Sequence, residues 1–155
     1  MKLLHLLICA ATVGSYSVIA KAQTRTPNGL INVPSSYDIA TTADRFETLL
    51  NNRGLIVFHR INHTENAVMV GQTLSPIELI IFGNPEVGTK LINCQQTAAI
   101  DLPQKALFWT DKNGKSWISY NNPAYLRDRH NLRGCERAIA KISQVLRNLA
   151  RKAGE

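Results

Sequence analysis

The dipeptide Asn113-Gly114 restricts the possible fold more than any other short stretch of this 155-residue chain. It lies between two runs, 105–111 and 116–120, that are rich in β-branched and aromatic side chains. Asn-Gly favours the tight turn of a β-hairpin because both residues tolerate a positive φ angle. The two runs are therefore predicted to be neighbouring antiparallel strands.

Three further apolar runs predict strands over residues 30–33, 55–61 and 77–83. Residues 35–54 have apolar side chains at helical spacing and end in Gly54, while residues 135–153 predict a long helix with an apolar stripe opposite a basic face. Short helices are expected at 65–70, at 86–93 and near Pro123. The order β-α-β-β-β-β-α predicts an α+β two-layer sandwich, with an antiparallel-rich sheet and helices on one face.

The first 22 residues have the pattern of a signal peptide, with a lysine, an apolar run and Ala20-Lys21-Ala22 before the expected cleavage site. The alternative is an N-terminal membrane anchor, since the run is just long enough to span a bilayer. A lipoprotein signal does not fit, because Ile8 precedes Cys9. We expect a mature chain of residues 23–155 that forms one domain in the periplasm, with secretion as the alternative.

The chain has 18 basic and 11 acidic residues, and removing Lys2 and Lys21 leaves a net charge of about +5. An exported protein is not expected to meet nucleic acid. The basic residues gather late in the chain, so the predicted last helix either has a solvated basic face or docks on an acidic partner or an anionic membrane surface. They are Arg127, Arg129, Arg133, Arg137, Lys141, Arg147, Arg151 and Lys152. No run after residue 22 is long enough to cross a membrane.

Two cysteines, Cys94 and Cys135, remain after cleavage. An even number in an oxidising compartment favours a disulfide, which here would close a loop of about 40 residues. The alternative is two buried free thiols. A metal site formed by these two cysteines is not predicted, because they are far apart and the chain has no CxxC pair.

Several polar residues at predicted strand ends are candidates for a ligand-binding site. His63 follows a strand and could act as a base, and Asp101 lies in an apolar setting where a carboxylate needs donors. The complete set is His63, Asp101, Lys105, Tyr120, Asn121 and His130. For His63 the alternative is a helix-capping role, for Asp101 a structural corner, and for the others packing or surface positions. The expected structural turns contain Gly83, Asn84, Pro85 and Pro103.

Several of these motifs, in this order, resemble the bacterial family catalogued as domain of unknown function 302. The resemblance rests on His63 in RINHTENA, on FGNP (82–85), on AIDLP (99–103) and on Tyr120-Asn121 followed by Pro123, Tyr125, Leu126, Arg129 and His130. It covers residues 29–134. It implies a compact α+β fold similar to that of the TATA-binding protein, often a dimer and frequently exported, with no established activity. Members usually have a small or polar residue at the position of Cys94.

Three functions stay open. The first is a non-enzymatic binding or stress-related module, with a small polar or anionic ligand or a metal ion near His63, Asp101 and Tyr120. The second is a small hydrolase or isomerase in which Asp101 orients His63 as the base. The third is an interaction protein that docks through its basic last helix. The chain lacks HExxH, GxSxG and Gly-rich phosphate-loop motifs, which favours the non-enzymatic function, and the cofactor, if there is one, stays unknown.

Overall fold

The computed structural model describes residues 24–25 and 28–155, so the predicted signal peptide lies outside the described residues. The strands are β1 (Thr24–Arg25), β2 (Leu30–Pro34), β3 (Ile56–Asn62), β4 (Ile77–Gly83), β5 (Gln104–Thr110) and β6 (Ser116–Asn121). The helices are α1 (Ile39–Asn51), α2 (His63–Met69), α3 (Pro85–Cys94), the 3-10 helix η1 (Gln96–Asp101), α4 (Pro123–His130) and α5 (Glu136–Gly154).

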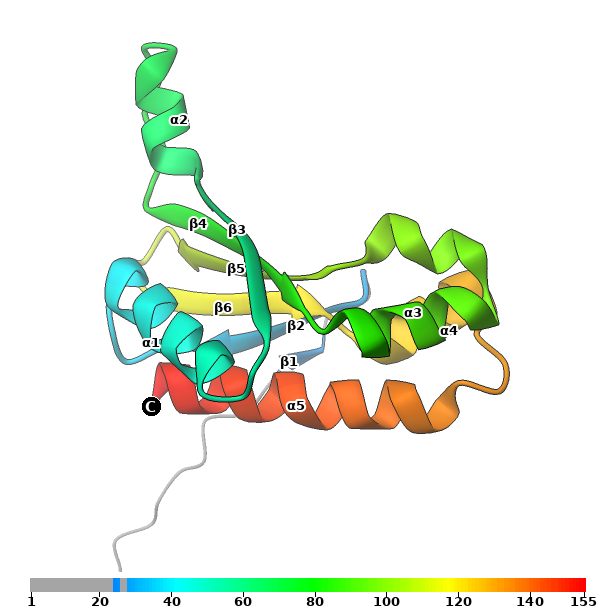
Figure 1. Ribbon diagram of the computed structural model, residues 1–155. Helices are drawn as coiled ribbons and strands as arrows, with labels where there is room; N and C mark the ends of the chain where they lie inside the picture. The colour runs from blue at the N-terminus through cyan, green and yellow to red at the C-terminus, as the bar shows by residue number, and fades with distance from the viewer. Residues whose placement is uncertain (1–23, 26–27) are drawn as a thin grey trace, which may run out of the picture.

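The strands form one sheet in the order β1-β2-β6-β5-β4-β3, and all of the pairings in the described residues are antiparallel (Figure 1). The predicted hairpin is present: the backbone N–H of Asp111 donates to the carbonyl of Lys115 at 2.9 Å, and Gly114 has a φ of 77°. The fold is therefore the α+β sandwich that the sequence predicts, with α1 and α5 on one face of an antiparallel sheet.

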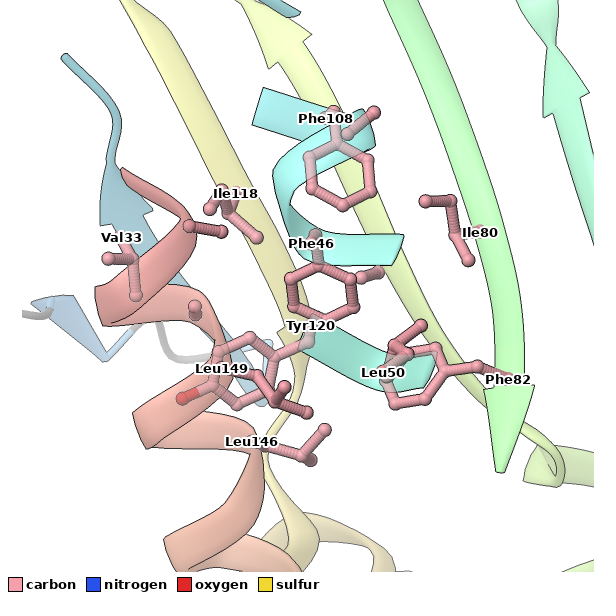
Figure 2. Packing of buried hydrophobic residues seen from close by; sticks show 14 of the residues in the cluster. Val33, Phe46, Leu50, Ile80, Phe82, Phe108, Ile118, Tyr120, Leu146 and Leu149 are labelled. Atoms are coloured by element: carbon pink, nitrogen blue, oxygen red, sulfur yellow. The ribbon is translucent and has the colours of Figure 1, made fainter. Parts of the chain in front are cut away.

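The core lies between that sheet face and the two helices. Residues of β4 alternate between buried and half-buried, as expected for a strand with helices on one side only. Phe46 of α1 packs edge-to-face against Phe82 and Phe108, with ring centroids 5.3 Å apart in each pair. Figure 2 shows these rings together with Leu146 and Leu149, which come from α5.

An ionic cluster attaches α1 to the sheet. Arg60 of β3 hydrogen-bonds through Nε and Nη2 to the carboxylate of Glu78, and its Nη1 lies 2.6 Å from Asp44 Oδ1 and 3.0 Å from Glu47 Oε2 on α1. Glu78 is buried. Its hydrogen bonds, with smaller contributions from the other two carboxylates, raise the pKa of Arg60, so this guanidinium stays charged at every accessible pH.

Different helices lie beyond the two ends of β4. At its start, β3 and β4 support α2, which projects beyond the sheet, and at its other end the chain continues into α3 and η1, near α4 (Figure 1). The tip of the α2 arm is apolar and exposed, with Val68, Met69 and Val70 at 67%, 82% and 74% exposure. Among the described residues, no helix is both long and apolar enough to span a bilayer.

The structure differs from the predicted elements at several points, and the 3-10 helix η1 was not among the expected helices. Strand β1 was not expected, because two residues are too few to produce a periodic pattern. Helix α2 begins at His63 rather than at residue 65, because the side chain of Asn62 accepts a hydrogen bond from the backbone N–H of Glu65 at 3.1 Å and caps the helix. Helix α5 is shifted by one residue from the expected 135–153.

Candidate functional site

A pocket of about 610 Å³ opens where α3 and α5 face the end of the sheet. We call it the α3–α5 pocket. Its walls are the end of β4 with α3, the η1–β5 corner, part of α5 and the segment that joins α1 to β3. The volume falls within the range of sites that hold small organic molecules.

The lining of the pocket is mostly apolar, and its charged residues have one sign. Helix α3 contributes Val87 and Ile92 to the lining, and α5 contributes Val145 and Leu146. The charged lining residues are Arg53 and Lys141, both exposed, and the described lining contains no carboxylate. The pocket therefore combines an apolar interior with a cationic rim.

Gln104 gives this apolar interior a buried polar group. It is the first residue of β5, pairs with Phe82 of β4 and lies on the helix-covered side of the sheet with Ala106 and Phe108. The residue is 9% exposed, and its Nε2 atom is buried without a hydrogen-bond partner among the residues that the structure describes. Buried amide nitrogens are nearly always hydrogen-bonded in native proteins, which makes Gln104 an unusual residue of the pocket lining.

The predicted turn residues build one wall of the pocket. Asn84 Oδ1 accepts hydrogen bonds from the backbone N–H groups of Glu86 at 2.8 Å and Val87 at 3.2 Å, which starts α3 at Pro85. Gly83 lies close to Pro103, whose peptide bond with Leu102 is cis. All four predicted turn residues, Gly83, Asn84, Pro85 and Pro103, line the pocket.

A disulfide links the ends of two pocket walls. Cys94, the last residue of α3, is bonded to Cys135, which immediately precedes α5, with their Cα atoms 6.5 Å apart. Leu91, Ile139 and Cys135 form a second small apolar cluster behind this link. The two helices that face each other across the pocket are therefore tied covalently at one end.

A side-chain network holds the η1–β5 corner to α4. Asp101 Oδ2 lies 2.6 Å from His130 Nε2, and Asp101 Oδ1 accepts from Arg129 Nη1 at 3.3 Å. The other ring nitrogen of His130 lies 3.1 Å from Thr97 Oγ1, and Lys105 Nζ donates to the carbonyls of Asp101 and Pro103 at 3.2 Å each. Three of the predicted site residues, Asp101, Lys105 and His130, are thus together, in an arrangement that fixes the corner leading to Gln104.

The predicted grouping of His63 and Tyr120 with Asp101 was wrong. His63 follows Asn62, which pairs with Glu78 at the start of β4, whereas Asp101 precedes β5 at the other end of β4. The two residues are separated by the length of that strand, roughly 20 Å. Tyr120 is 3% exposed and lies in the core (Figure 2), and Asn121 ends β6 opposite Leu30 of β2.

Within the described part of the chain, no three His, Cys, Asp or Glu side chains are close enough together to hold a metal ion. The predicted site also omitted Gln104, Arg53 and Lys141. For Gln104 a signal was present, since it is a polar residue in register with the buried positions Ala106 and Phe108 of the same strand. For Arg53 and Lys141 the sequence held no such signal, because their common position at the pocket depends on how α1 and α5 pack.

A family model described as "Domain of unknown function DUF302" matches residues 31–149. A solved structure of an uncharacterized conserved DUF302 protein from Bacillus stearothermophilus superposes with a TM-score of 0.73 at 21% sequence identity, covering 81% of this chain and 98% of that one. At this identity the likeness concerns the fold.

Proteins from Brucella named fluoride-specific ion channels are also similar in sequence. FluC 1 of Brucella suis biovar 1 (strain 1330) is 43% identical over 105 residues, which is 68% of this chain and 41% of that protein. FluC 2 of Brucella melitensis biotype 1 has the same identity, over 39% of its length. The present chain thus spans about two-fifths of the length of these relatives.

Proposed function

This chain belongs to the DUF302 family, whose function is unknown, and we propose that it is an exported, non-enzymatic binding module whose small ligand occupies the α3–α5 pocket. The single observation that carries the proposal is the buried Nε2 atom of Gln104, which has no partner in the described chain and belongs to a residue lining a pocket of about 610 Å³. A ligand oxygen would satisfy it.

The surrounding contacts support a site that is formed before the ligand arrives. The disulfide joins the α3 and α5 walls, and the Asp101–His130 contact holds the corner that leads to Gln104. Such preorganisation lowers the entropy that binding must overcome. In the Brucella relatives the matched segment is part of a longer protein, which supports the idea of a module that works in more than one context.

The proposed compartment is the periplasm. It is supported by the signal-peptide pattern of residues 1–22 and by the disulfide, since such bonds persist in oxidising compartments. Docking through the basic face of α5 stays a prediction, and so does a homodimer.

Gly88 offers a variant that blocks the pocket. It lies within α3 and lines the pocket, and a Cβ atom at this position would meet no atom within 4 Å. Gly88→Leu therefore adds an apolar side chain where there is room for it, and it replaces a poor helix former with a good one. Asn93→Leu makes a matched control, because Asn93 is an exposed residue of the same helix that does not line the pocket.

The test is native mass spectrometry of the protein purified from the periplasm of its host. We expect the wild type and Asn93→Leu to retain a small-molecule adduct and Gly88→Leu to lose it, with both variants at least as resistant to thermal unfolding as the wild type. An adduct that persists in Gly88→Leu would exclude the α3–α5 pocket as its site.

A second candidate function follows from the Asp101–His130 contact. The proposed hydrolase in which Asp101 orients His63 does not fit, because the two lie at opposite ends of the sheet. His130 instead contacts both Asp101 and the hydroxyl of the exposed residue Thr97, which is the order of contacts found in acid–base–nucleophile sites. If this arrangement is catalytic, a hydrolytic activity found in an ester screen must be lost in Thr97→Val; activity that survives would eliminate it.

A further inference from the structure

The chemistry of the pocket lining restricts the class of ligand that it can hold. The side chains facing the space from α3 and α5 are largely apolar, among them Val87, Ile92 and Val145. Strongly hydrated ligands would lose their water against such walls without finding enough hydrogen bonds in return. The body of the ligand is therefore an apolar chain or ring.

The rim of the pocket selects the sign of the ligand's charge. Arg53 and Lys141 line the pocket, and neither forms an ion pair with another residue that the structure describes. Glu86 forms its ion pair with Lys90 at 2.7 Å, and Lys141 lowers the pKa of Glu86 further from a greater distance. Both cations are free to pair with a ligand, so an anionic head group is favoured over a neutral or cationic one.

Gln104 adds a donor for an oxygen atom. Gln104 is nine-tenths buried, and its Nε2 group has no hydrogen-bond acceptor among the described residues. A carboxylate supplies oxygen acceptors and a negative charge in one group, which matches a buried N–H donor together with one lysine and one arginine side chain.

We infer that the ligand is an amphipathic monocarboxylate, with an apolar body along α3 and α5 and a carboxylate recognised by Gln104, Lys141 and Arg53. The inference rests on the proposed function, because it assigns a chemical class to the ligand of the same pocket. Binding of this ligand involves no covalent step.

Sodium decanoate is a suitable probe, with decan-1-ol and decyltrimethylammonium as neutral and cationic probes of the same chain length. In isothermal titration calorimetry we expect decanoate to bind at least ten times more tightly than either of the others. Raising the salt concentration should weaken decanoate binding and leave decanol binding unchanged, because salt screens only the charged contact.

Substitutions test the contacts to the head group independently of the apolar pocket. Lys141→Gln and Arg53→Gln are expected to weaken decanoate binding about five-fold to ten-fold each and to leave decanol binding unchanged. Gln104→Met is expected to weaken decanoate binding by a similar factor. Arg147→Gln is the matched control, since Arg147 is an exposed cation of α5 that does not line the pocket.

The outcomes distinguish the two proposals. If decanol binds as tightly as decanoate, or if the Lys141 and Arg53 variants bind decanoate like the wild type, the carboxylate assignment is overturned while Gly88→Leu still tests the pocket. If Gly88→Leu binds decanoate as tightly as the wild type, the probe sits elsewhere and both proposals fail. Loss of decanoate binding in Gly88→Leu, with the expected charge preference in the wild type, supports both.

Discussion

Gln104 is the residue on which the proposed binding function depends most. The positions that share its strand face, Ala106 and Phe108, are apolar and buried, so an apolar side chain at position 104 would suit the fold alone. A buried amide nitrogen without a partner costs about 1–3 kcal/mol of stability. A residue that lowers stability in the free protein is typical of a binding position.

We therefore predict that Gln104→Met stabilises the ligand-free protein by about 1 kcal/mol, because it removes an unsatisfied buried donor and keeps an unbranched side chain of similar length. Urea unfolding of the wild type and the variant measures this difference. The control Gln144→Met, at an exposed position of α5, is expected to change stability by no more than about 0.5 kcal/mol. A clear loss of stability in Gln104→Met would mean that the amide already has a partner.

The sequence predicts the roles of some single residues but not the contacts of others. The exit from β4 at Gly83, Asn84 and Pro85 is predictable, because the effects of these residues on the backbone are local. The contact between Asp101 and His130 was not foreseen, since it joins residues 29 positions apart through the packing of α4 on η1. Both residues had been selected individually from their motifs.

At the scale of elements, the disulfide joins α3 to the start of α5 across a sequence separation of 41 residues. We predict that Cys94→Ser combined with Cys135→Ser lowers the free energy of unfolding by about 2–4 kcal/mol, because the unfolded chain loses a constraint on a loop of this size. Denaturant unfolding with and without reductant measures it. Wild-type stability that is insensitive to reductant would contradict the prediction, and the double variant should not respond to reductant.

The Arg60 cluster allows a test of how α1 is held. Removing the guanidinium in Arg60→Leu leaves Glu78 buried without its partner, and we predict a loss of about 2–3 kcal/mol. Arg60→Leu combined with Glu78→Leu should recover at least half of that loss, because no uncompensated charge then remains. Equal stability of the single and double variants in chemical denaturation would show that removing Glu78 relieves no penalty, and it would contradict the prediction.

The pH dependence of that loss has a definite sign. The folded-state pKa of Arg60 is raised, so its contribution is complete below the unfolded pKa and is lost only as the pH rises through the folded one. Both values lie above the range of ordinary experiments, so the Arg60→Leu penalty should be constant between about pH 6 and pH 10. A penalty that declines toward pH 10 would contradict the assignment.

The order of the elements also explains why the predicted site was only partly right. Consecutive strands of an antiparallel sheet reverse direction, so a residue just after β3 and a residue just before β5 lie at opposite ends of β4. His63 and Asp101 occupy these two places. The two strand ends are predicted to within one residue, but the predicted grouping requires them to share one edge of the sheet.

For the whole molecule, periodicity and turn signals were sufficient to predict the α+β class, the antiparallel sheet and the helices on one face. The pocket was not predictable in the same way, because it arises where α3, α5 and the η1–β5 corner meet, and no local pattern records the space between packed elements. Its lining nevertheless includes all of the predicted turn residues. The turns that follow β4 and precede β5 therefore build one wall of the pocket.

The most direct test of the account is to observe the side-chain amide of Gln104 while a carboxylate is added. In ¹H–¹⁵N correlation spectra, the Gln104 side-chain signals are identified by their absence in Gln104→Met and followed during titration with sodium decanoate. We expect these signals to shift in a saturable manner, together with the backbone signals of α3 and α5 around the pocket, and we expect Gly88→Leu to abolish the shift. Saturable binding that leaves the Gln104 amide signals unchanged would contradict this expectation.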